Sequence, residues 1–156
     1  MNTYEFTIIL GGVDHKAPQY EDAFFEAGCD DALLCVKGNT VFIEFMREAV
    51  SAEKAVSSAI ENIIFAGAHV VAINEAGPVT ISEAASMAGM TRAALGQLES
   101  GIRGAGGFPA PVHAGTTLIW TWISIARWLN DAGKISQPKI ELAEYLQSKL
   151  KTPMLS

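Results

Sequence analysis

Apolar and polar residues alternate at the start of the chain, which is the pattern of a half-buried β-strand. The apolar set of the segment 3–10 is Tyr4, Phe6, Ile8 and Leu10, and two glycines follow it. Two further β-rich segments, 32–36 and 40–45, flank Lys37-Gly-Asn39, whose composition suits a tight hairpin. Residues 69–73 supply one more short apolar segment. The first half of the chain is therefore predicted to contain four strands.

Two segments between these strands have apolar residues at helical spacing instead. The first begins near Pro18, ends at Gly28 and carries Tyr20, Ala23, Phe24 and Ala27. The second follows Ser51, ends at Gly67 and carries Ala52, Ala55, Val56, Ala59, Ile60, Ile63 and Ile64. The resulting order, βαββαβ, is that of a ferredoxin-like sandwich, in which both helices cover one face of an antiparallel sheet.

Residues 1–76 are thus expected to form a ferredoxin-like α+β domain, with Glu75-Ala-Gly-Pro78 as the linker to the second half of the chain. Ile9, Phe42 and Met46 are expected on the second face of its sheet. An apolar face of this kind suits a dimer interface or a protein partner.

Two short helices are predicted after the linker. Thr80 and Glu83 have the spacing of a capping box, and Gly89 suits the left-handed residue that ends a helix. Between them, an apolar stripe is formed by Ile81, Ala84, Ala85 and Ala88. Thr91 is the next N-cap, and the second helix points Ala94, Leu95 and Leu98 inward. Its outer face carries Arg92, Ala93, Gly96 and Gln97, although Gly96 costs about 1 kcal/mol of helix stability relative to alanine.

This helix-turn-helix continues into a glycine-rich flexible turn (101–107), a hairpin and a third helix (123–129). Residues 79–130 resemble the winged helix-turn-helix of the excisionase and AlpA type, a MerR-like DNA-binding fold of bacteria and phages. The segments that carry the resemblance are Ser82–Gly89, Met90-Thr91-Arg92, Gly107-Phe-Pro-Ala-Pro-Val112, Trp120 and Ile125–Leu129. The three tryptophans are expected as core and wing anchors, with Trp122 the candidate for exposure.

The resemblance implies that double-stranded DNA is the partner and that the helix beginning at Arg92 enters the major groove. Arg92 and Gln97, with Ala93 beside them, would then face the bases, since Arg and Gln suit guanine and adenine. The groups expected at phosphates are Thr91, Arg103, His113, Thr116 and Thr117. Because one subunit offers few cations (Arg92, Arg103 and Arg127), a homodimer or a helper protein is expected.

The domain organisation is completed by a winged helix-turn-helix domain at 77–134 and a C-terminal helix and tail at 135–156. The tail contains Pro138 followed by Ile140, Ala143, Tyr145, Leu146 and Leu150. Such an amphipathic helix can pack on the winged domain or pair with its equivalent in a second chain, and both arrangements fit the sequence.

Charge is distributed unevenly over these parts. Residues 1–76 hold four basic and twelve acidic residues, a net charge of −8, whereas residues 77–134 hold four basic and three acidic ones, a net charge of +1. An acidic first unit would be repelled by phosphate and would turn the second unit toward DNA. An ordinary acidic surface that keeps the protein soluble explains the same numbers.

Catalytic, cofactor and metal sites are not expected. The three histidines His15, His69 and His113 are scattered, and Cys29 and Cys35 lack a metal-ligand spacing and are expected to be reduced thiols. No apolar run is long enough to span a bilayer, so a cytoplasmic protein is expected.

Together with the helix-turn-helix and its resemblance, these observations favour a bacterial or phage transcription regulator. The alternative is an antitoxin-like or partner-binding adaptor whose winged fold does not bind DNA.

Overall fold

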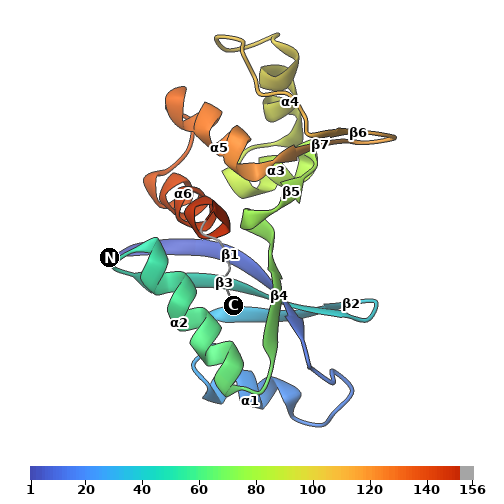
Figure 1. Cartoon of the computed structure of the whole chain (residues 1–156), viewed down its shortest axis with the longest axis vertical. Helices are drawn as coiled ribbons and strands as arrows, with labels where there is room; N and C mark the ends of the chain where they lie inside the picture. Colours follow the sequence, from blue (N-terminus) through green and yellow to red (C-terminus); the bar gives the residue numbers. More distant parts are fainter. Residues whose placement is uncertain (152–156) are drawn as a thin grey trace. The chain divides into compact units, whose positions relative to one another are not determined.

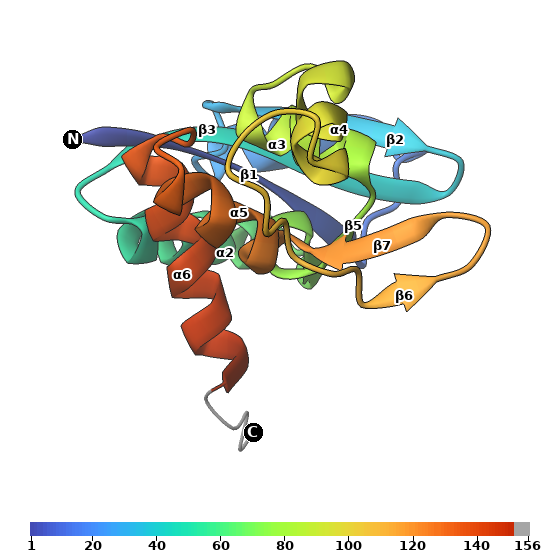
Figure 2. The ribbon, with the colours of Figure 1, turned by 90° about the horizontal axis from the view of Figure 1, so that it is seen from above.

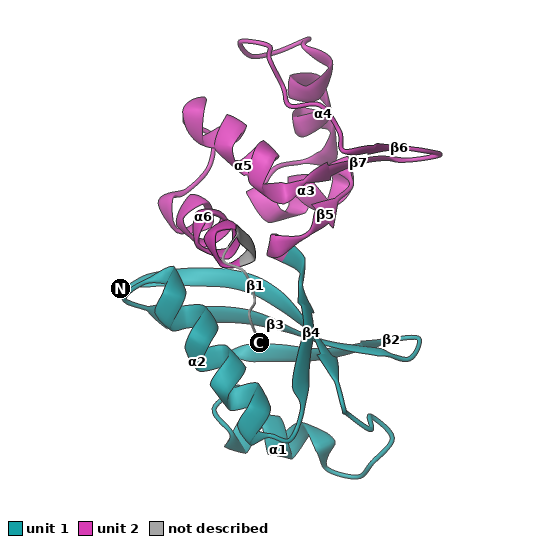
Figure 3. Cartoon of the chain, in the orientation of Figure 1, with its two compact units in different colours: residues 1–74 teal, residues 75–156 magenta. Residues whose placement is uncertain are grey.

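The computed structural model describes residues 1–151, with side chains as far as Lys149, and the chain divides after Asn74 into two compact units (Figure 3). Its described part contains six α-helices, one four-stranded sheet and one three-stranded sheet, and all strand pairs are antiparallel. The predicted α+β class is confirmed.

The first unit follows the order of strands and helices that the sequence predicts. Its elements are β1 (Asn2–Gly11), α1 (Tyr20–Glu26), β2 (Ala32–Lys37), β3 (Thr40–Ala49), α2 (Ala52–Phe65) and β4 (His69–Ile73). The strands lie in the order β2-β3-β1-β4, and β1 and β3 form the centre of the sheet. Helix α2 runs along one side of this sheet (Figure 1).

The core of the first unit lies between the sheet and α2. The alternating apolar residues of β1 are all buried. Phe6, Ile8 and Leu10 pair with the buried residues Phe45, Ile43 and Val41 of β3, and Tyr4 pairs with Arg47. The rings of Phe6 and Phe45 stack with their centroids 5.2 Å apart. On α2, the buried positions are Ala52, Ala55, Val56, Ala59 and Ile63, so that small side chains bring the helix close to the sheet.

The opposite face of the sheet carries the residues predicted for it. Ile9 pairs with Phe42, and Glu5 pairs with Met46, so these side chains share one face between the buried positions. Ile9 and Phe42 are half-buried and Met46 is 61% exposed. Leu33 of the edge strand β2 adds a further exposed apolar side chain to this face.

Helix α1 is shorter than predicted. Pro18 lies in the turn before the helix, and Gln19 adopts a left-handed conformation (φ 63°) that prevents the helix from beginning earlier. Phe24 is its one buried residue, and Ala23, predicted to point inward, is exposed.

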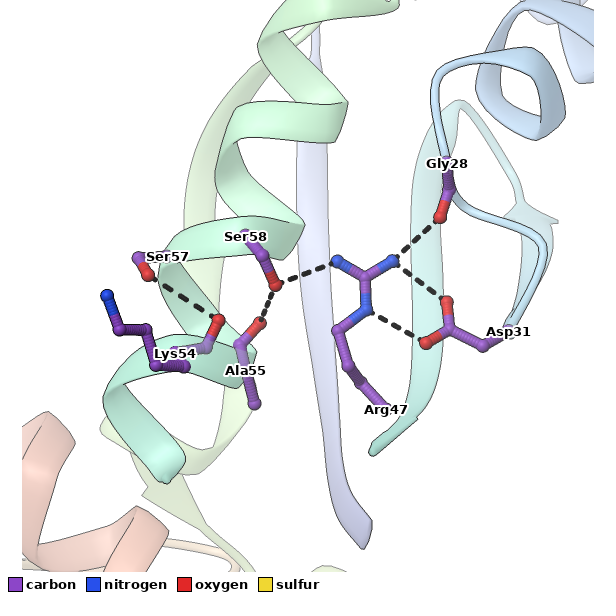
Figure 4. A network of polar contacts seen from close by, with 7 residues as sticks. All are labelled: Gly28, Asp31, Arg47, Lys54, Ala55, Ser57 and Ser58. Carbon is purple, nitrogen blue, oxygen red and sulfur yellow. Dashed lines mark hydrogen bonds and ion pairs between the residues drawn. The ribbon is translucent and has the colours of Figure 1, made fainter. Parts of the chain in front are cut away.

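A buried arginine connects three parts of the first unit (Figure 4). Arg47 of β3 donates from Nε and Nη2 to the two carboxylate oxygens of Asp31, at 2.8 and 2.9 Å. It also donates to the Gly28 carbonyl at 2.8 Å and to the Ser58 hydroxyl at 3.1 Å. Its guanidinium lies 4.9 Å from the centroid of the Phe45 ring. The loop after α1 is thereby joined to the sheet and to α2.

A short 3-10 turn (Asn74–Ala76) spans the boundary between the two units, and Pro78 of the second unit pairs with Thr121. Its elements are β5 (Pro78–Val79), α3 (Ile81–Ala88), α4 (Arg92–Ser100), β6 (His113–Ala114), β7 (Leu118–Thr121), α5 (Trp122–Asp131) and α6 (Gln137–Lys151). The small sheet has the order β5-β7-β6.

One apolar core holds the second unit together. Its most deeply buried members are Val79, Ala84, Ala85, Leu95, Trp120, Trp122, Ile125, Ala126, Leu129 and Ala143. Trp122 is 2% exposed, so its expected exposure is wrong. The reason is that α5 begins at Trp122, one residue earlier than predicted, and its first turn lies against the core.

Helix α6 packs on the second unit, which is one of the two arrangements left open by the sequence. Ile140 and Ala143 belong to its core, and Arg127 of α5 forms an exposed ion pair with Glu144 at 2.6 Å. The side chain of Leu150 and residues 152–156 lie outside the described part of the chain.

Both cysteines are free thiols, and Cys29 is buried beside the Arg47 cluster. Burial raises the pKa of the Cys29 thiol from 9.0 to about 11; the Arg47 charge opposes this, and Asp31 and Asp30 add to it. Below pH 9 the thiol is neutral in the folded and the unfolded chain. Between pH 9 and 11 the Cys29 thiol loses its proton in the unfolded chain but keeps it in the folded chain. Rising pH therefore stabilises the unfolded state relative to the folded state.

We therefore expect the free energy of unfolding to fall by roughly 2 kcal/mol between about pH 9 and about pH 11 through this group. Denaturant titrations of the wild type and of Cys29→Ala across this range measure the effect. The variant should show a flatter dependence on pH than the wild type, and parallel curves would contradict the assignment.

Candidate nucleic-acid interface

Helix α3 is bounded by the local interactions that the sequence predicts. The Thr80 hydroxyl accepts from the Glu83 amide at 3.2 Å, and the Glu83 carboxylate accepts from the Thr80 amide at 2.8 Å, which completes the capping box. Gly89 ends the helix in the left-handed conformation (φ 74°). This tight end sets the turn that leads directly into α4.

Helix α4 begins at Arg92 with Thr91 as its N-cap, as predicted, and the Thr91 hydroxyl oxygen accepts from the Ala94 amide at 3.0 Å. The side chains of Leu95 and Leu98 form the buried face of this helix. Thr91, Arg92 and Ala93 are exposed at its first turn, whereas Gln97, one turn further along, is half-buried. The residues predicted to face bases therefore lie on the accessible side of α4, with Gln97 more recessed than Arg92.

Gly96 has a specific role in the geometry of Arg92. A Cβ atom added at Gly96 would lie 2.6 Å from Nη1 of Arg92, which shows that the guanidinium folds back over this glycine along the helix. The helix-weakening Gly96 thus leaves room for the Arg92 side chain against the backbone. To contact a base, Arg92 must swing outward by rotation of its side-chain bonds.

A hollow of about 480 Å³ opens beside α4. It is lined by Met90, Ala94, Gln97, Leu98, Arg103, Gly104 and Lys134. The structure thus brings Gln97 and Arg103 together and places Lys134 beside them, a residue that the sequence did not indicate. The signal for Lys134 was only its position after Gly133, a typical helix C-cap, and nothing local indicates that this helix end lies beside α4.

The glycine-rich segment after α4, predicted as a flexible turn, is held at Gly106 by a tryptophan side chain. The indole N–H of Trp128 donates to the Gly106 carbonyl at 3.1 Å, and that of Trp120 donates to the Pro109 carbonyl at 2.9 Å. The Phe108 ring lies edge-on to both indoles, with centroids 6.1 Å from Trp120 and 5.2 Å from Trp128. Aromatic side chains of β7 and α5 therefore fix the path of the chain from α4 to the hairpin.

The β6–β7 hairpin extends as an arm from the helices of the second unit (Figure 2). Its strands pair His113 with Ile119 and Ala114 with Leu118, and the Gly115 amide donates to the Thr117 carbonyl at 3.4 Å to close the tip. His113, Thr116 and Thr117 are all exposed. The structure gathers these three predicted phosphate contacts at one tip, separate from the residues that line the hollow.

Arg127, counted among the cations of this unit, has its charge offset by Glu144 in α6. Arg92, Arg103 and Lys134 form no ion pair in the described part of the chain. These three are consequently the cations that the second unit offers to an anionic ligand near α4.

Within residues 1–151, no group of three or more histidine, cysteine or acidic side chains is arranged to hold a metal ion. None of the described helices combines the length and the apolar character needed to cross a bilayer. Comparison with known proteins gives no relative: no family model, no curated protein and no solved structure matches this chain.

Proposed function

We propose that this protein is a sequence-specific DNA-binding protein, a transcription regulator that reads the major groove with α4. The observation that carries the proposal is the capped α3–Gly89–α4 unit, which leaves Thr91, Arg92 and Ala93 exposed at the first turn of its second helix. The N-terminal side chains of a recognition helix are those that reach base edges in this mode of binding.

The arrangement of the second unit supports the winged form of this motif. The three-stranded sheet β5-β7-β6 supplies a hairpin arm after the two helices, and α5 packs behind them in the same core. In the first unit, the strand order β2-β3-β1-β4 together with the element order βαββαβ supports a ferredoxin-like sandwich.

Each exposed group has a chemistry suited to a different part of the duplex. The guanidinium of Arg92 can donate two hydrogen bonds to guanine, and the amide of Gln97 can pair with adenine. Thr91 uses its oxygen as an acceptor in the helix cap, so its hydroxyl proton is free to donate to a phosphate. At the tip of the hairpin, the imidazole of His113 and the hydroxyls of Thr116 and Thr117 supply neutral donors to phosphates.

A homodimer is part of the proposal because so few cations serve each subunit. Affinity for duplex DNA rises with the number of phosphates neutralised, and two linked copies double that number. Such a regulator acts in the cytoplasm, where bacterial DNA lies.

A protein-interaction adaptor is the second candidate. It is favoured by the exposed apolar face of the first unit, where Leu33 and Met46 are 62% and 61% exposed, and by a hairpin tip without Lys or Arg. An adaptor of this kind would bind another protein through the acidic first unit and would leave DNA alone.

We expect Arg92→Ala and Gln97→Ala each to weaken binding to a selected DNA site by roughly 5- to 150-fold, because each removes a bidentate base contact of about 1–3 kcal/mol. Binding to unrelated DNA should change much less. Mobility shifts against genomic fragments, at low and at moderate salt, identify the site and measure both variants.

Arg127→Ala is the matched control, since it removes one exposed arginine of the same unit that is already paired with Glu144. It should leave sequence preference unchanged. Absence of retention of any fragment by the wild type at every salt concentration would reject DNA binding and favour the adaptor.

A further inference from the structure

Two unpaired cations line one hollow beside α4. Arg103 comes from the segment after α4 and Lys134 from the segment after α5, and the other polar lining residue is Gln97. No carboxylate lines the hollow, and neither Arg103 nor Lys134 forms an ion pair within the described part of the chain. The hollow therefore has a positive rim that nothing within it neutralises.

Main-chain hydrogen bonds fix the backbone positions of Arg103 and Lys134. The Arg103 amide donates to the Gln97 carbonyl at 3.2 Å, which ties the segment back onto α4. The Lys134 amide donates to the Leu129 carbonyl at 2.8 Å, after Gly133 has turned the chain in the left-handed conformation (φ 69°). The backbone of both cationic residues is thus held by hydrogen bonds. A ligand that binds in the hollow has to order only their two side chains.

We propose that this hollow binds a phosphate of the DNA backbone, with Arg103 and Lys134 neutralising its charge. The inference rests on the proposed function, because it places that phosphate beside the helix that would enter the groove. Met90, Ala94 and Leu98 give the hollow an apolar floor against which the attached deoxyribose can lie. Its volume of about 480 Å³ accommodates a phosphate together with its sugar.

DNA is a better occupant than a free phosphorylated effector for two reasons. Arg103 and Lys134 are exposed, whereas pockets for small ligands enclose most of the ligand surface. The hollow also borders α4 itself, and phosphates flank every element that enters the major groove. Lys134 then belongs to the interface and fixes the register of α4 without reading any base.

The test compares three variants that each lose one positive charge: Lys134→Gln, Arg103→Gln and the control Lys37→Gln. Lys37 is exposed in the first unit, far along the chain from the hollow. Fluorescence anisotropy measures binding to a selected duplex and to a scrambled one between about 50 and about 200 mM salt. The two hollow variants should bind both duplexes roughly five- to tenfold more weakly, with the salt slope reduced by about 0.9. The control should retain the slope of the wild type.

If the wild type binds DNA and both hollow variants keep its salt dependence of binding, the inference about the hollow is overturned. The proposal that α4 binds the major groove would then still stand. A wild type that binds neither duplex would instead overturn the proposed function and this inference with it. Titration with inorganic phosphate at constant ionic strength, followed through the Met90 methyl signal, tests the other source. Saturation at micromolar phosphate would assign the hollow to a free phosphorylated ligand and overturn its assignment to DNA.

Discussion

Replacing Arg47 with alanine is expected to lower the free energy of unfolding of the first unit by about 3–5 kcal/mol. The Arg47 side chain is only 9% exposed, and its removal leaves the Asp31 carboxylate without its bidentate partner. The Gly28 carbonyl and the Ser58 hydroxyl lose a donor at the same time. A partly buried carboxylate without a partner is costly, because the interior solvates its charge poorly.

Arg127→Ala provides the control for this prediction. Arg127 also pairs with a carboxylate, but its side chain and that of Glu144 are about half exposed, so we expect a loss of less than about 1 kcal/mol. Amide hydrogen exchange measures the two units separately, in β1 and β3 for Arg47→Ala and in α5 for Arg127→Ala, because the two arginines lie in different units. Equal losses for the two arginines would show that burial does not set the strength of the Arg47 cluster.

Trp122→Ala is expected to destabilise the second unit by about 3–5 kcal/mol. Trp122 is among the largest fully buried side chains, and it lies in the core with Val79, Leu95 and Leu129. Truncation removes the apolar surface of the indole from the core and leaves a cavity. The helices α3, α4 and α5, which contribute to this core, would have to shift to fill it. Since α3 and α4 share this core, the proposed DNA binding should also weaken near the lowered melting temperature.

The fluorescence of Trp120 and Trp128 reports unfolding of the Trp122→Ala variant in urea, since both remain in the same unit. Ile102→Ala is the matched control, because Ile102 is an apolar residue of that unit that is 75% exposed. It should change stability by less than about 0.5 kcal/mol. A loss for Trp122→Ala no larger than that of the control would contradict the burial of Trp122.

The helix ends around the candidate interface were predictable because the interactions that form them span only a few residues. Thr80 and Glu83 cap α3 and Thr91 caps α4 through bonds between residues three apart. The outward position of Arg92 follows from the same local periodicity. Its orientation does not, since the fold-back over Gly96 depends on which side-chain rotamer the surroundings favour.

Contacts between distant residues were missed for the opposite reason. Asp31 and Arg47 each look like ordinary surface charges in the sequence, and only the pairing of β3 with the loop after α1 brings them together. Lys134 reaches the hollow beside α4 because α5 packs against the helix-turn-helix, and no pattern near residue 134 records that packing.

The sequence by itself determined the α+β class, the order of strands and helices in the first unit, the caps of α3 and α4, and the apolar faces of β1 and α3. Those features depend on periodicity and on hydrogen bonds between near neighbours, which any folded arrangement preserves. The tertiary structure alone decided the Arg47 cluster, the burial of Trp122, the docking of α6 on α5 and the cationic hollow. Each of these depends on which surfaces meet in space, because close packing selects one set of long-range contacts from many that the same local pattern allows.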